Sequence, residues 1–87
     1  MKLNDLNTIM EKHNIWKHDY CINEGNKPLA ETALCLMKTA KGFEYYVSER
    51  NVKHDIQFFR DENEACRAFL ADMAYSHPVL KQYISAS

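Results

Sequence analysis

The side chains best suited to bind a metal ion or to act as a nucleophile are four histidines and three cysteines. They are His13, His18, His54, His77, Cys21, Cys35 and Cys66. No two cysteines are separated by two residues and no two histidines by three, which are spacings typical of zinc sites. The pattern therefore predicts no metal site and no cofactor.

A cysteine nucleophile needs a base beside it, and the three thiols differ in how well they fit that role. Cys66 lies on an apolar helical stripe and is expected in the core, whereas Cys21 and Cys35 could each meet a histidine in the folded chain. Gly25 and Gly42 stand alone, so no glycine-rich phosphate loop is present. We therefore expect a protein that is not an enzyme. An enzyme built on Cys21 or Cys35 is the alternative hypothesis for these thiols.

Composition favours one globular domain over residues 1–87. The chain has 87 residues and a net charge of −1, with only 2 glycines and 2 prolines, which argues against disorder and against a strongly basic nucleic-acid binder. Its apolar runs are too short to cross a bilayer, and no targeting segment is visible. The odd number of cysteines favours reduced thiols, so we expect a cytoplasmic protein without membrane or nucleic-acid partners.

One aromatic segment, residues 43–53, combines features of a binding surface. Tyr46 and Arg50 are of the residue types enriched at interface hot spots, and charges of both signs surround them. Aromatic residues on a strand also form stacking platforms for nucleic acid, but no basic cluster accompanies them here.

Periodicity predicts the elements that position these residues. Leu3, Leu6 and Ile9 recur at helical spacing, which predicts a helix over residues 3–13 that ends at an asparagine in the left-handed conformation. A short strand over 19–23 and a turn over 24–28 follow.

Three further strands are predicted over 31–38, 43–48 and 53–59, with a tight connection over 39–42. In the first of them, for which a helix is the competing interpretation, Cys35 and Met37 face one side and Leu36 the other. In the last, Ile56 and Phe58 are expected to be buried.

A second helix is predicted over 61–76, followed by an amphipathic tail. Asp61 should cap its free amides and Glu64 should reach back to the cap. In the tail, Leu80, Tyr83 and Ile84 are expected to pack back as a further helical turn. The resulting class is α+β, with an N-terminal helix, a four-stranded antiparallel meander and a C-terminal helix. Both helices should pack on one face of the sheet, which leaves the other face open.

Two blocks of this chain resemble the small immunity proteins of bacterial polymorphic-toxin and contact-dependent growth-inhibition systems. The first block consists of Tyr20, Ile22, Gly25, Glu31, Cys35, Leu36, the run 45–50 and Lys53. The second consists of Phe59, the run 62–66, Phe69 and Leu70. Asn51 stands where that family often has glycine, and the tail after residue 76 is longer than expected.

The resemblance implies an antitoxin without catalysis of its own, which binds the toxic domain of a secreted effector, often a nuclease. Such an inhibitor would block the active site of the toxin or its access to substrate, and local carboxylates would suit a basic cleft. The residues expected to contact the toxin are Glu44, Tyr46, Glu49, Arg50 and Asp55. The alternative is a small nucleic-acid-binding or regulatory module that uses the open face of the sheet.

Overall fold

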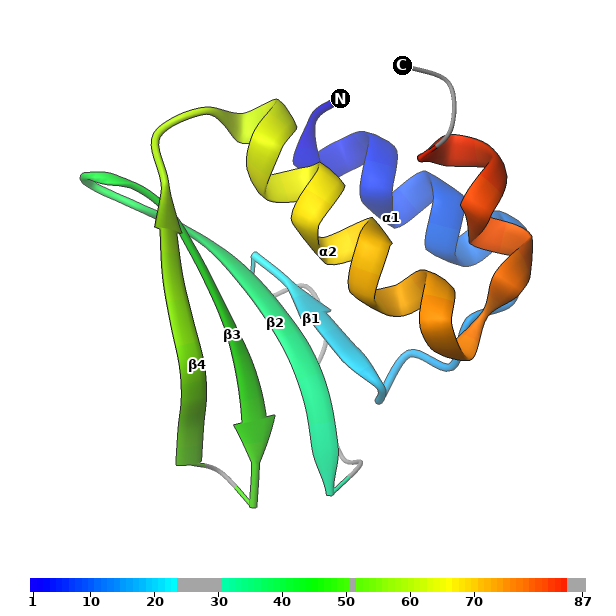
Figure 1. The fold of residues 1–87 in the computed structure, drawn as a ribbon, viewed down its shortest axis with the longest axis horizontal. Helices are drawn as coiled ribbons and strands as arrows, with labels where there is room; N and C mark the ends of the chain where they lie inside the picture. The colour runs from blue at the N-terminus through cyan, green and yellow to red at the C-terminus, as the bar shows by residue number, and fades with distance from the viewer. Residues whose placement is uncertain (24–30, 51, 85–87) are drawn as a thin grey trace.

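The computed structural model describes residues 1–23, 31–50 and 52–84, and it has two layers (Figure 1). The elements in chain order are α1 (Leu3–Lys12), β1 (Tyr20–Ile22), β2 (Thr32–Thr39), β3 (Gly42–Glu49), β4 (Val52–Phe59), α2 (Glu62–Ser76) and the 3-10 helix η1 (Pro78–Tyr83). The helices lie on one side of a four-stranded sheet of order β1-β2-β3-β4. The predicted turn over 24–28 lies outside the described residues.

The sheet is mixed, so the expectation of a purely antiparallel meander was wrong. β2, β3 and β4 are antiparallel neighbours, but β1 runs parallel to β2, with Cys21 opposite Cys35. A strand as short as β1 spans only about 10 Å, so its parallel pairing with β2 needs no long crossover between the two strands. The register places Tyr20 opposite Leu34 and Ile22 opposite Leu36, on the helix side of the sheet, where Tyr20 and Ile22 are about 1% exposed.

The core lies between the helices and the sheet. α1 contributes a stripe of buried residues at helical spacing, and it ends where Asn14 takes the left-handed conformation, as predicted (φ 53°). At the centre is Phe69 of α2, which is fully buried. The rings of Tyr20 and Tyr45 meet it edge-on, with centroids 6.4 Å and 6.1 Å away.

The start of α2 is bonded to the start of α1. Asp61 caps α2, as predicted, because its Oδ1 accepts a hydrogen bond from the backbone of Asn63 (3.3 Å). The predicted contact of Glu64 with the cap is not among the hydrogen bonds of the described residues, so this part of the prediction was wrong. Glu62 instead bonds to α1, since its Oε2 accepts from the backbone N–H of Leu3 (2.9 Å). The two helices are therefore held together by polar contacts at one end as well as by the core.

The C-terminal tail packs back as predicted. Leu80 of η1 is fully buried, and the Tyr83 hydroxyl lies 2.7 Å from Nε2 of His13 in a hydrogen bond. This hydrogen bond joins η1 to the C-terminal end of α1.

β4 is an edge strand and departs most from expectation. Ile56 and Phe58, expected to be buried, are 47% and 66% exposed. Phe59 pairs with Phe43 on the helix side, so its neighbour Phe58 must point to the opposite face. A bulge interrupts the strand, because the register shifts between Tyr45 and Val47 and Asp55 has a φ of 53°.

The β2–β3 turn depends on Gly42, and its replacement is our first prediction. Gly42 has a φ of 144°, and an added Cβ would lie 2.5 Å from the carbonyl oxygen of Phe59. We expect Gly42→Ala to lower the free energy of unfolding by about 2 kcal/mol or more, measured by urea denaturation. Lys41→Ala is the matched control and should change it by less than about 0.5 kcal/mol. Equal stabilities of the two variants would contradict this role of Gly42.

Candidate functional site

The face of the sheet turned away from the helices carries a mixed apolar and charged surface, which we call the outer face. Strand alternation assigns to it the residues Met37, Glu44, Tyr46, Lys53, Ile56 and Phe58, together with Cys35, which is buried. Neither α1 nor α2 covers this side of the sheet (Figure 1). The outer face is thus the part of the sheet where a partner can meet large apolar side chains.

Tyr46 lies at the centre of the outer face and is held by its neighbours. The Lys53 ammonium sits 4.6 Å from the centroid of the Tyr46 ring and 2.9 Å from Oε1 of Glu44. The Glu44 side chain is only 17% exposed, against 52% for Lys53. Burial raises the pKa of Tyr46 to about 12, so its hydroxyl stays protonated and able to donate.

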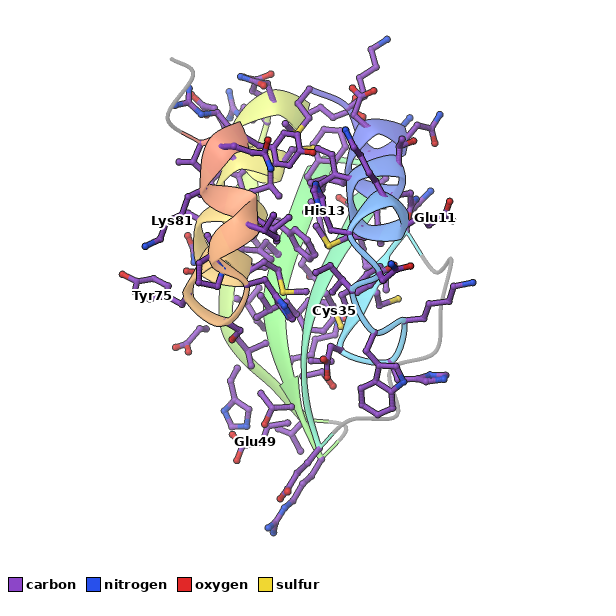
Figure 2. The ribbon with its side chains drawn as sticks, turned by 90° about the vertical axis from the view of Figure 1, so that its right-hand side faces the viewer. Glu11, His13, Cys35, Glu49, Tyr75 and Lys81 are labelled. Atoms are coloured by element: carbon purple, nitrogen blue, oxygen red, sulfur yellow. The ribbon has the colours of Figure 1, made fainter. Side chains whose placement is uncertain are left out.

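The structure brings together only part of the predicted site. Glu44 and Tyr46 share the outer face, and Asp55 lies in the bulge of β4 opposite Tyr46. Glu49 and Arg50 instead lie at the far tip of the sheet, where Figure 2 shows Glu49.

Arg50 is bonded as a turn residue. Its Nε lies 2.8 Å from Oε1 of Glu31, and its backbone N–H donates to the Glu31 carbonyl (3.0 Å). Glu49 Oε2 lies 3.9 Å from Nε2 of His54. Glu49 and Arg50 are neighbours in sequence, but each of them contacts another residue. Both side chains of the Arg50–Glu31 pair are mostly exposed, so this ion pair contributes little to stability.

The sequence interpretation missed Phe58 and Ile56 as surface residues. The signal was present in the pair Phe58–Phe59, because consecutive residues of a strand point to opposite faces and this strand has only one covered face. The bulge at Asp55 had no comparable signal. It shifts the alternation of β4, which places Lys53 on the same side as Ile56 and Phe58.

The three cysteines are free and buried. Burial raises the pKa of Cys35 to about 11, with a further contribution from neighbouring Cys21, and burial also raises the pKa of Cys66 to about 11. Thiols of such high pKa are weak nucleophiles at neutral pH. Among the described residues, no group of three or more histidine, cysteine, aspartate or glutamate side chains could hold a metal ion.

Comparisons with known proteins do not add to this picture. No family model, curated protein or solved structure matches the chain. No helix formed by the described residues is long and apolar enough to span a membrane. The function is therefore inferred from the residues of the chain alone.

Our second prediction concerns thiol reactivity. Because the pKa rises from 9.0 to about 11, Cys35 and Cys66 should hold about 100-fold less thiolate at pH 8 in the folded chain than in the unfolded one. We expect labelling with Ellman's reagent to be slower by at least that factor in the native protein. The control is the same reaction in guanidinium chloride, where all three thiols should react. A thiol at either position that reacts at the unfolded rate in the native protein would revive the hypothesis of a cysteine enzyme.

Proposed function

We propose that this chain is an immunity protein that binds the toxic domain of a bacterial effector through its outer face and prevents the toxin from reaching its substrate. The observation that carries the proposal is the exposure of Phe58 and Ile56 beside the Glu44–Lys53 pair. The resemblance of residues 45–50 and 62–66 to immunity proteins supports the same class.

Large apolar side chains on the outer face suit a protein partner. Burying Phe58 in an interface would contribute about 1.5–3 kcal/mol, and aromatic anchors of this kind dominate binding energy. Tyr46 adds a second ring whose position is fixed by Lys53, so little side-chain freedom is lost when a partner covers it.

The charges of the outer face support a partner with matching local charges. The chain has a net charge of only −1, so a general attraction to a basic toxin would be weak. Glu44, Lys53 and Asp55 instead give alternating signs within one surface. Such alternation favours specificity for one partner over broad attraction to nucleic-acid-binding proteins.

The bulge in β4 favours contact through the face rather than through the strand edge. Asp55 lies in the left-handed conformation and two residues of β4 stand opposite Tyr46, so the edge of β4 is not a regular template for another strand. A partner that packs flat on the outer face does not need such a template.

The resemblance divides between scaffold and surface. Tyr45, Cys66 and Phe69 are buried, so these matching residues specify the fold. Tyr46, on the other side of β3, is available for recognition, and so is Glu44 beside it, which lies outside the resemblance. On this proposal the buried part of the pattern is common to the class, and the outer face selects the toxin.

The third prediction is formation of the complex itself. We expect the protein to copurify with the C-terminal domain encoded immediately upstream of its gene, and calorimetry to give a one-to-one complex of nanomolar affinity. Coexpression should also restore growth to cells that produce that domain. A folded protein that neither binds nor protects would refute the proposal. Tight, salt-sensitive binding of RNA or DNA would then favour the nucleic-acid-binding alternative.

The fourth prediction locates the interface. We expect Phe58→Ala and Tyr46→Ala each to weaken toxin binding by about 2 kcal/mol, or roughly 30-fold. Phe58→Ala should leave the melting temperature unchanged, since the side chain is 66% exposed. Tyr75→Ala is the matched control, because Tyr75 is an 88% exposed aromatic residue on α2. Loss of binding in the control, or full binding by both outer-face variants, would place the interface elsewhere.

A further inference from the structure

Cys21 and Cys35 form a pair of thiols where β1 meets β2. They are direct partners in the parallel register of the two strands. Both thiols are free, and the two residues are 3% and 2% exposed. They lie outside the cluster of buried side chains that joins the helices to the sheet. The packing of the core therefore does not account for two cysteines at these positions.

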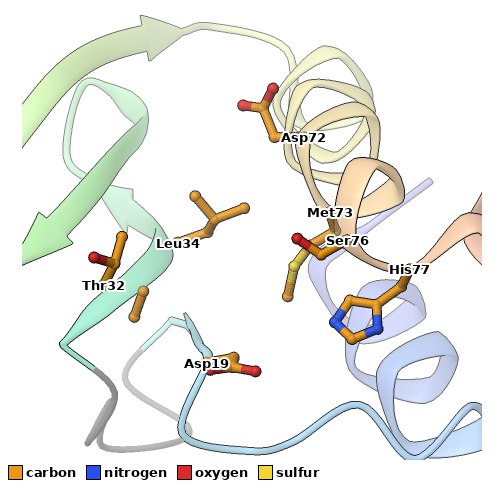
Figure 3. Close-up of a pocket in the computed structure, with 8 residues that line it drawn as sticks. Asp19, Thr32, Leu34, Asp72, Met73, Ser76 and His77 are labelled. Atoms are coloured by element: carbon orange, nitrogen blue, oxygen red, sulfur yellow. The ribbon is translucent and has the colours of Figure 1, made fainter.

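Both side chains leave the sheet on the side away from the helices. Figure 3 shows Leu34 of β2 turned toward α2, across the cavity that lies between them. Cys35 is the next residue, so strand alternation turns it to the outer face. Cys21 lies between Tyr20 and Ile22, which both belong to the core on the helix side, so it is turned the same way as Cys35.

Register partners on neighbouring strands are close enough for a disulfide. Neighbouring strands lie about 4.8 Å apart, and the Cα atoms of a bridged pair are usually roughly 4.4–6.8 Å apart. After burial, Cys21 has the largest effect on the pKa of Cys35, and hydrogen bonding between the two side chains is part of that effect. A bond between the sulfurs therefore needs little movement of either strand.

The position of the pair admits a small oxidant and excludes a bulky one. Neither α1 nor α2 covers the outer face, but both cysteines are almost fully buried in the sheet. Burial also raises the pKa of Cys35 to about 11, so little thiolate is present at neutral pH and the reaction is slow. Such a pair suits a response to sustained oxidation and not rapid catalysis.

We propose that Cys21 and Cys35 are a redox-sensitive pair, which closes to a disulfide when the folded protein meets hydrogen peroxide and thereby fixes β1 to β2. One thiol, as its thiolate, attacks the O–O bond of the peroxide and becomes a sulfenic acid, with release of hydroxide. The other sulfur then displaces the sulfenic oxygen, which leaves as water. Overall the two thiols give up two electrons and two protons, and one peroxide becomes two molecules of water. The proposal does not rest on binding of a toxin.

The disulfide should stabilise the edge of the sheet. β1 is three residues long and has a strand neighbour on one side only. A bridge from β1 to β2 closes a loop in the unfolded chain and lowers its entropy. We expect the oxidised protein to unfold at a urea concentration higher by about 1 M or more than the reduced protein. An equal or lower midpoint would show that the bridge strains the sheet, which contradicts the proposed geometry.

The test is peptide mass mapping of the folded protein after treatment with millimolar hydrogen peroxide. Remaining thiols are blocked with N-ethylmaleimide in guanidinium chloride, and the chain is cleaved after glutamate, which separates Cys21 from Cys35 at Glu24 and Glu31. We expect one linked pair of peptides, lighter than the two reduced peptides by two hydrogen atoms, and a blocked Cys66. Dithiothreitol should restore both thiols. Sulfenic or sulfinic acid without a link, or equal linkage to Cys66, would overturn the proposal.

Three variants and one condition separate a native pair from chance oxidation. Cys21→Ala and Cys35→Ala should give no link, and the remaining thiol should be trapped by dimedone as a sulfenic acid. Cys66→Ala is the matched control, because Cys66 lies in the core on the helix side, and it should form the link as the wild type does. Oxidation in guanidinium chloride should give all three pairings of the cysteines. The same mixture from the native protein, or a link that forms only in the unfolded chain, would refute the pair.

Discussion

The packing of Phe69 against Tyr20 and Tyr45 is the contact on which the rest of the molecule depends. It joins α2 to the edge strand β1 and to the central strand β3, and all three side chains are almost fully buried. A domain this small buries a limited share of its surface, so a few large side chains must supply much of the core. The same contact reaches the surface through Tyr45, whose hydroxyl bonds to the exposed Asp72 of α2.

Two neighbouring tyrosines show how one strand serves two layers. Tyr45 points to the helices and Tyr46 to the outer face, because consecutive residues of a strand alternate. The side chains around Tyr46 are then free to satisfy a partner, while those around Tyr45 must satisfy the core.

Local patterns predicted the helices, β3 and the cap at Asp61, because these depend on periodicity and on side chains close in sequence. The direction of β1 is set by its pairing with β2, and no pattern of residues within β1 records that pairing. The exposure of Phe58 follows from which face of β4 the helices leave uncovered. Glu44 and Tyr46 share a face because they lie two positions apart on one strand, which local alternation is enough to predict. Arg50 needed its partner Glu31, nineteen positions away, to be understood as a turn residue.

The bond between His13 and Tyr83 joins residues that are 70 positions apart. Leu80, buried beside it, belongs to the same late segment of the domain. During translation the domain therefore cannot complete its core until Leu80 has left the ribosome, and α1 has to wait for α2, which is made late, before its apolar stripe is covered. Folding should accordingly be one cooperative event late in the synthesis of this domain, rather than a gradual assembly from its first helix onward.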